Sequence, residues 1–128
     1  DAGMAYNTFP LMEGQLVPEA MFDMTPWAVN FFENIATVQF DHRVLAIITF
    51  VAIVLLWLRG RNPALSGRSA RAVHSLAMMA LIQMALGIST LLLFVPVSLA
   101  VLHQAVALVL FTLALWTAYE LRGLQPQG

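Results

Sequence analysis

Two histidines, His42 and His103, carry the side chains in this sequence that are best suited to chemistry. Each lies in a long apolar stretch, and His42 stands between Asp41 and Arg43 where its stretch begins. Ionisable groups inside a membrane are costly and mark functional sites by default. Imidazole is also the commonest protein ligand for metals. These residues therefore direct attention to a polar or metal site between helices.

The composition is that of an integral membrane protein. Of the 128 residues, 60% are hydrophobic and only 10% are charged, whereas roughly a quarter are charged in soluble domains. The net charge of -1 gives no reason to expect a nucleic-acid partner. Because the chain has no cysteine, disulfides and thiolate metal sites are excluded. The expected surroundings are a lipid bilayer.

Three apolar stretches predict three transmembrane helices, at about residues 37–58, 72–95 and 97–118. Each is long enough to cross ~30 Å of hydrocarbon at ~1.5 Å per residue. Pro96 marks a tight turn between the second and third spans. The prediction is an all-α membrane domain over residues 35–128, preceded by a separate segment over residues 1–34.

Residues 1–34 form the polar part, with five of the seven acidic residues. Pro10, Pro18 and Pro26 rule out one long helix there. Thr25-Pro26 predicts the start of a short helix, with threonine as N-cap and proline in the first turn. Trp27, Phe31 and Phe32 follow, and such rings favour the membrane interface. We expect a loop with a short interfacial helix.

Charge predicts the orientation. The linker "RGRNPALSGRSAR", residues 59–71, and the end of the chain hold five of the six basic residues, Arg59, Arg61, Arg68, Arg71 and Arg122. By the positive-inside rule this side faces the cytoplasm, or the matrix in a mitochondrion, and residues 1–34 face outside. An odd number of spans, and a first residue that is Asp1, fit a piece of a longer protein or a separate processed subunit; both remain open.

Helix geometry predicts which histidines can meet. His42 lies near the outer end of the first span, and His103 lies seven residues beyond Pro96, ~10 Å below the same surface. His74 lies ~30 Å away at the inner surface. We therefore expect His42 and His103 to face each other, and His74 to be an interfacial polar residue near Arg71.

Two functions fit the pair. Membrane histidines can simply hydrogen-bond across helices, or two imidazoles from facing helices can be the axial ligands of a haem iron. Small neighbours favour the second hypothesis, because Ala46, Ala100 and Ala107 leave room beside the histidines for a flat macrocycle. Gly87 on the second span could help in the same way, or serve only in helix packing.

The polar neighbours have alternatives too. Arg43 could pair with haem propionates, form an ion pair with Asp41 or Glu33, or anchor the helix at the interface. Gln39 lies on the same helix face as His42. Gln104 follows His103 and could orient a ligand or hydrogen-bond another helix. Gln83 is expected to hydrogen-bond another helix. Tyr6, Asn7 and Phe9 could cover the haem edge, meet a partner, or only stabilise the loop.

Four stretches, in order, resemble the C-terminal half of haem A synthase. They are "DAGMAYNTFPLM" (1–12), "FFENIATVQFDHRVLA" (31–46), "QMALGISTLL" (83–92) and "VPVSLAVLHQAVALVLF" (95–111). The resemblance implies two similar four-helix bundles, each with a histidine pair near the outer side. It also implies an oxidoreductase that converts a methyl group of haem O to the formyl group of haem A for terminal oxidases.

In that family, an N-terminal half with a Glu-x-x-His-Arg motif is associated with the reacting haem, and a C-terminal half holds a haem b for electron transfer. The matching stretch here is Gln39-Phe40-Asp41-His42-Arg43. Because an amide cannot replace a carboxylate in proton transfer, the resemblance implies the cofactor half. His42 and His103 match the iron ligands, and no residue of this chain is expected to be catalytic.

The resemblance implies partners and a location. The N-terminal half of the same protein would hold the substrate, with haem O synthase or cytochrome oxidase assembly factors as further partners, in a bacterial plasma membrane or a mitochondrial inner membrane. One helix of this four-helix half would precede Asp1. Two alternatives stay open: a standalone b-type cytochrome subunit for electron transfer, and a structural or assembly membrane protein with histidines as polar contacts.

Overall fold

The computed structural model describes residues 6–31, 33–61, 65 and 67–123. Two short 3-10 helices, η2 (Glu19–Phe22) and η3 (Trp27–Phe31), precede α1 (Ile35–Gly60), α2 (Gly67–Leu92) and α3 (Val97–Arg122). Within the described ranges there is no strand, and Met12 and Gln15 form an isolated bridge. All three α-helices are long and apolar enough to cross a membrane, which confirms the predicted all-α membrane fold.

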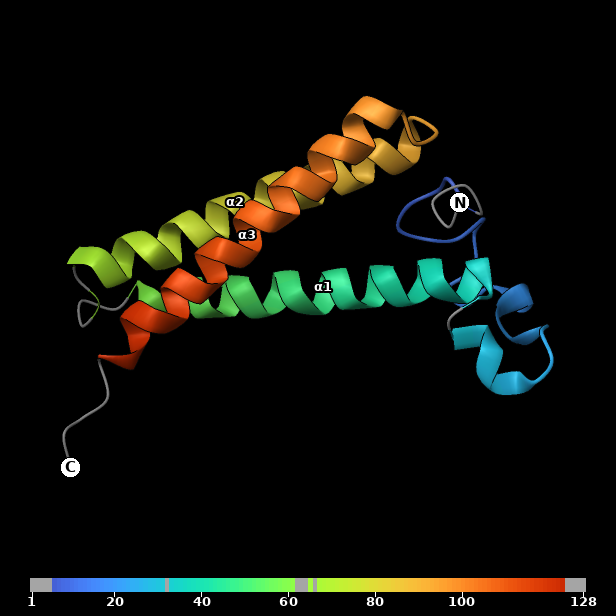
Figure 1. The fold of residues 1–128 in the computed structure, drawn as a ribbon, viewed down its shortest axis with the longest axis horizontal. Helices are drawn as coiled ribbons and strands as arrows, with labels where there is room; N and C mark the ends of the chain where they lie inside the picture. Colours follow the sequence, from blue (N-terminus) through green and yellow to red (C-terminus); the bar gives the residue numbers. More distant parts are fainter. Residues whose placement is uncertain (1–5, 32, 62–64, 66, 124–128) are drawn as a thin grey trace.

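The helices form a hairpin and a diverging arm. Helices α2 and α3 run antiparallel along each other, whereas α1 packs mainly against α2 and diverges from the hairpin toward the N-terminal segment (Figure 1). The end where α1 and the hairpin diverge lies near His42 and His103, and we call it the histidine end. The opposite end is called the arginine end, because it carries Arg59, Arg61, Arg68, Arg71 and Arg122.

Small side chains allow α2 to pack closely. The buried residues of α2 recur at helical spacing, and most are small: Ser69, Ala72, Val73, Leu76, Ala80 and Thr90. Without a hydrophobic driving force between helices in lipid, such faces associate by van der Waals contact of closely spaced backbones. The long side chains of α1 and α3 are left mostly exposed, as a lipid-facing or partner-facing surface requires.

The second predicted span extends too far. It was expected to reach Val95, but α2 ends at Leu92 because Phe94 and Val95 adopt positive φ angles of 61° and 56°. The Val95 N–H donates to the Thr90 carbonyl (2.8 Å) and the Phe94 N–H to the Leu91 carbonyl (3.2 Å). This is a Schellman-type helix end, in which Phe94 takes the left-handed position that glycine usually fills. Apolar character alone could not reveal it.

The other helices are longer than their apolar cores. The first was expected over about 37–58 and the third over about 97–118, whereas α1 ends at Gly60 and α3 at Arg122. Both therefore include charged residues in their last turns, Arg59 in α1 and Arg122 in α3. Long basic side chains can continue a helix into the headgroup region because the charge reaches water. α2 likewise begins earlier than predicted, at Gly67.

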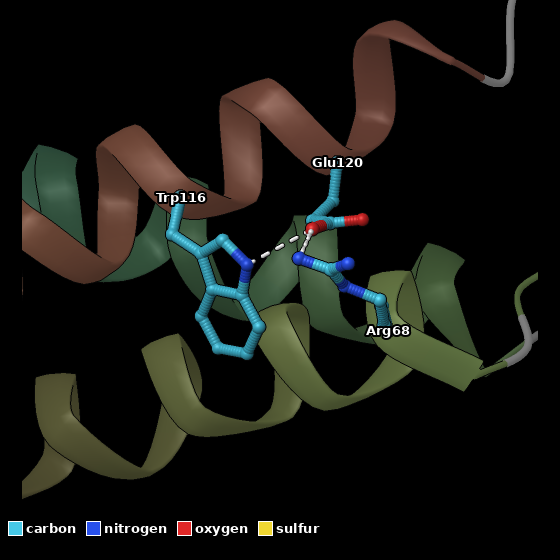
Figure 2. A network of polar contacts seen from close by, with 3 residues as sticks. All are labelled: Arg68, Trp116 and Glu120. Carbon is cyan, nitrogen blue, oxygen red and sulfur yellow. Dashed lines mark hydrogen bonds and ion pairs between the residues drawn. The ribbon is translucent and has the colours of Figure 1, made fainter.

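One ion pair joins the two helices of the hairpin at the arginine end (Figure 2). Arg68 of α2 lies 3.1 Å from the Glu120 carboxylate of α3, which also accepts a 3.0 Å hydrogen bond from the Trp116 indole. The arginine side chain is 69% exposed, so the pair contributes at most about 1 kcal/mol. It joins α2 to α3 at the end of the hairpin opposite the turn.

The outer segment contains two 3-10 helices, whereas a single short helix was predicted after Thr25-Pro26. Their rings form one cluster: Phe22 stacks on Trp27 with ring centroids 5.7 Å apart, and Phe31 contacts both edge-on. Trp27 is 61% exposed, which suits a ring at a membrane interface. Phe32, expected in the same stripe, lies outside the described residues.

Two buried asparagines attach the outer segment to α1. Asn34 caps α1 by accepting from the Ala36 and Thr37 N–H groups at 3.0 and 3.2 Å. Its amide donates to the Ala20 carbonyl at 2.7 Å and to Asn30 at 3.1 Å. Asn30, fully buried, bonds the backbone of Met24 and Trp27, and Thr37 Oγ1 donates to the Met21 carbonyl. The outer segment is thus an extension of α1.

Asn34→Ala should destabilise this attachment by about 1–3 kcal/mol, because it removes the helix cap and leaves buried polar groups unpaired. We expect faster proteolysis within residues 6–31 of the detergent-solubilised protein and an earlier thermal transition. Glu33→Ala, a change at the neighbouring exposed residue, is the matched control. Equal proteolysis of the two variants would contradict the role assigned to Asn34.

Candidate functional site: a histidine-lined cavity between the helices

A cavity of about 540 Å³ lies between the three α-helices, from the histidine end to the middle of the bundle. Ligand pockets commonly have volumes of about 300–1,000 Å³. Most of the wall is apolar, and Phe9 of the outer segment contributes to it. Its polar side chains include both candidate histidines; they are Gln39, His42, Arg43, Thr49, Gln83, Thr90, His103 and Gln104.

His42 of α1 and His103 of α3 face each other across this cavity. Their ring centroids are 6.3 Å apart and their planes are at 80°. The expected meeting of these two histidines is therefore present in the structure. It brings together side chains from two helices that make little direct contact with each other, so the space between them is open to a ligand.

Gly87 of α2 lets the His103 ring lie against the helix. A Cβ atom at position 87 would be 2.9 Å from His103 Cε1, 3.5 Å from Nε2 and 3.6 Å from Nδ1. The first of these distances is closer than carbon atoms can approach without displacement, so any other residue there would push the ring away. Gly87 was suggested to leave room for a macrocycle or to serve in helix packing; in this geometry the imidazole of His103 occupies the space beside it.

Arg43 and Gln39 connect the cavity wall to the outer segment. Arg43 donates to the carbonyls of Tyr6 (3.0 Å), Pro10 (3.3 Å) and Leu11 (3.4 Å). The Gln39 amide donates to the same Tyr6 carbonyl at 2.8 Å. Within the described ranges, Arg43 forms no ion pair with Asp41 or Glu33, which were its expected alternative partners. The guanidinium charge therefore stays without a carboxylate beside the cavity.

Buried polar atoms without a hydrogen-bond partner concentrate at this cavity. Over the part of the chain that the structure describes there are five, and all but Asn7 Oδ1 belong to residues of the wall: Gln39 Oε1, Arg43 Nε, Gln83 Oε1 and His103 Nδ1. Such atoms are rare in folded proteins because each costs free energy. These atoms of the wall are therefore available to bond polar groups of a ligand.

The remaining sequence candidates divide between the cavity and its surroundings. Ala46, Ala100 and Gln104 line the cavity, as does Gln83, which was expected only to bond another helix. Ala107 lies outside the wall, because the α3 residue that contributes at that depth is Leu110. Of the loop residues suggested to cover the site, Phe9 lines it and Tyr6 anchors the loop through its carbonyl.

His74 lies at the arginine end, away from the other two histidines, as helix geometry predicted. It accepts a 3.2 Å hydrogen bond at Nδ1 from the indole N–H of Trp57 on α1. Arg61 lies over the same indole, with its Cζ 5.3 Å from the ring centroid. Sequence reasoning missed this contact between helices, although Trp57 and His74 both fall near the inner surface and could have been paired.

The donor set suits iron that already has equatorial ligands. In the described ranges no group of three or more His, Cys, Asp or Glu residues is placed to hold a metal ion. A bare ion would lack ligands, whereas haem iron requires only two axial ligands from the protein. Two imidazoles facing each other across an apolar cavity meet that requirement.

Comparison with known proteins gives the family. The model of the cytochrome oxidase assembly protein family, COX15-CtaA, matches residues 1–115. The chain is 52% identical over 121 residues to the haem A synthase of Nitrosospira multiformis, which covers 94% of this chain and 34% of that protein. It is 46% identical over 122 residues to haem A synthase COX15 of Homo sapiens, covering 95% of this chain and 30% of that protein.

Haem A synthase COX15 of Arabidopsis thaliana is 46% identical over 126 residues, which are 98% of this chain and 28% of that protein. The chain thus spans about a third of the length of the relatives it matches. No solved structure matches it. Since the family model covers most of the sequence, and the relatives are similar along nearly all of it, this chain belongs to the cytochrome oxidase assembly protein family COX15-CtaA.

Proposed function

We propose that this chain is the C-terminal, haem b-binding part of a haem A synthase, with residues 1–34 as an outer cover and residues 35–128 as the membrane part. In the complete protein, a methyl group of haem O is oxidised to the formyl group of haem A. The role of this part is to hold an electron-transfer haem b through His42 and His103. The names of its relatives and the geometry of the cavity support the proposal.

The main support for this proposal is the distance between the two imidazoles. Two iron–nitrogen bonds of ~2 Å, and the ~1 Å from each ligating nitrogen to its ring centre, require a centroid separation of ~6 Å. The observed separation is 6.3 Å. Histidines that bonded each other directly would approach more closely, since hydrogen-bonded nitrogens lie only ~2.9 Å apart.

The cavity wall also suits the rest of a haem. Its apolar residues match a porphyrin face, and the Arg43 charge near the outer segment suits a propionate. The unpartnered Nε of Arg43 and the side chain of Gln104 supply further donors near the rim. With both axial positions filled by protein, a haem here would transfer electrons and leave no site for dioxygen.

Gln39 argues against substrate oxidation at this site. Its side chain is 5% exposed, and its amide nitrogen donates to the Tyr6 carbonyl. A carboxylate at the same position would face that carbonyl oxygen and would be repelled by it. The position is therefore suited to a neutral amide that fixes the outer segment, and the proton-transfer role of a glutamate belongs elsewhere in the complete protein.

The same proposal places the chain in a membrane. The arginine end would face the cytoplasm or the mitochondrial matrix, and the histidine end would face the outer side. The membrane would be the bacterial plasma membrane or the mitochondrial inner membrane, where the relatives' terminal oxidases need haem A. The N-terminal half of the protein would close the open side of the cavity and hold haem O, with haem O synthase or assembly factors as suppliers and acceptors.

Replacement of either ligand should abolish six-coordinate binding. After reconstitution with haem, His42→Ala and His103→Ala should each lose the low-spin six-coordinate absorption spectrum, because one axial bond is removed. His74→Ala is the matched control and should keep that spectrum, since its imidazole lies at the arginine end. A low-spin six-coordinate spectrum in both ligand variants would refute the assignment.

Gly87→Ala should weaken haem binding although residue 87 itself carries no ligand atom. Its methyl group would meet His103 Cε1, so the imidazole must turn away from the position in which it would hold a haem. We expect roughly a tenfold or greater loss of affinity, as for other groups that orient a ligand. Gly123→Ala is the control, since its Cβ would meet nothing closer than 3.8 Å. Haem titration followed by absorbance distinguishes the two variants.

Arg43→Gln should lower the reduction potential of the bound haem by roughly tens of millivolts, because a nearby positive charge favours the ferrous state. Redox titration of the reconstituted protein measures this change. Arg59→Gln, which removes the same charge at the arginine end, should leave the potential unchanged. If Arg43→Gln only increased proteolysis of the outer segment, its role would be confined to the contacts with Tyr6, Pro10 and Leu11.

A further inference from the structure

A second, smaller pocket lies at the arginine end and plays no part in the proposed haem site. It has a volume of about 370 Å³ and is formed where the end of α1 meets the first three turns of α2. The residues that line it are Trp57, Gly60, Arg61, Ala70, Arg71, Val73, His74 and Ser75. None of them is acidic, and two are arginines.

The pocket presents hydrogen-bond donors. His74 Nδ1 accepts from the Trp57 indole, so the neutral imidazole must carry its proton on Nε2, which is then a donor. The Ser75 hydroxyl and the guanidinium groups of Arg61 and Arg71 add further donors. Because Arg61 lies over the Trp57 ring, its side chain is held at the pocket and loses less freedom when it binds an anion.

Over the described ranges, carboxylates do not neutralise the positive charge of this pocket. Glu120 is the only acidic residue after Asp41, and it is already paired with Arg68 and bonded by Trp116. Among the described residues, this is the one ion pair at the arginine end (Figure 2). Arg61 and Arg71 line the pocket, and no carboxylate of a described residue pairs with either of them, so the site favours an anion.

We propose that this pocket binds the phosphate of an anionic phospholipid from the leaflet at the arginine end. Guanidinium groups bind phosphate oxygens through paired N–H donors, and basic pockets between membrane helices suit anionic headgroups. Trp57 lies at the depth where indole rings favour the headgroup boundary. Leu58, the residue after Trp57 on α1, is exposed and offers apolar surface to acyl chains. The inference is independent of the haem site.

A lipid bound in this pocket would stabilise the junction between α1 and α2. Gly60 lets α1 approach α2 closely here, since a Cβ at that residue would lie 3.0 Å from Leu65 and 3.1 Å from Val73. The pocket therefore spans the place where α1 joins the hairpin. A phosphate that contacts Arg61, the C-cap residue of α1, and Arg71 of α2 would link the two helices and stabilise the junction from which they diverge.

Native mass spectrometry of the detergent-solubilised protein can test the proposal. Titrated with phosphatidylglycerol or phosphatidylcholine, the protein should retain one phosphatidylglycerol and discriminate against the zwitterionic lipid. Arg61→Gln and Arg71→Gln should each weaken that binding about fivefold. Arg59→Gln and Arg122→Gln remove the same charge from the same end but outside the pocket, and should change it less than about twofold.

Three results would overturn the proposal. Equal losses in all four variants would show attraction by net charge without a site, and equal retention of phosphatidylcholine would exclude recognition of the anionic headgroup. Displacement of the lipid by inorganic phosphate at millimolar concentration would assign the pocket to a soluble anion. Circular dichroism confirms that each variant is folded, and an unchanged haem spectrum in Arg71→Gln separates this test from that of the haem site.

Discussion

The contact between the His103 imidazole and α2 is possible only because residue 87 has no side chain. The ring lies against the position that a Cβ would occupy, with its nearest atom 2.9 Å from that position. This steric condition brings the imidazole of α3 into the space that α1 and His42 also face. A side chain at residue 87 would displace this imidazole, and the two histidines would lose their common position. The site thus depends on the backbone of a helix that contributes neither imidazole.

The hydrogen bonding of buried polar groups is the second constraint on this structure. In a bilayer, a buried donor or acceptor without a partner has no water to compensate it. The chain satisfies most of its own groups: Asn34 caps α1, Thr90 and Thr117 donate to carbonyls within their own helices, and Glu120 accepts from two side chains. Of the five buried side-chain atoms without a partner among the described residues, four belong to the cavity wall. A polar ligand that bonds these atoms of the cavity wall would therefore also stabilise the protein.

Sequence reasoning predicted the features that follow from periodicity and depth. Apolar runs gave three spans, and the ~1.5 Å rise per residue placed His42 opposite His103 and separated His74 from both. It could not predict features that depend on a partner far along the chain. The bonds from Gln39 and Arg43 to Tyr6 join residues more than thirty positions apart, and neither residue type indicates a backbone carbonyl as its partner.

Local backbone conformation is the second kind of feature that sequence reasoning did not predict. The end of α2 is set by positive φ angles at Phe94 and Val95, residues that ordinarily continue an apolar span. Pro96 predicted a turn at the right place, but not the earlier departure from the helix. Similarly, the outer segment divides into two 3-10 helices because Asn30 and Asn34 bind its backbone at several points. Propensity alone contains no information about such tertiary bonds.

The attachment of the outer segment has a mechanical consequence. Its hydrogen bonds to the α-helices, among the residues that the structure describes, all reach α1, through Asn34, Thr37, Gln39 and Arg43. These hydrogen bonds therefore fix the segment to α1 and do not connect it to the hairpin. Any tilt of α1 away from α2 would carry Phe9 with it, so that the cavity widens and loses its cover in a single movement.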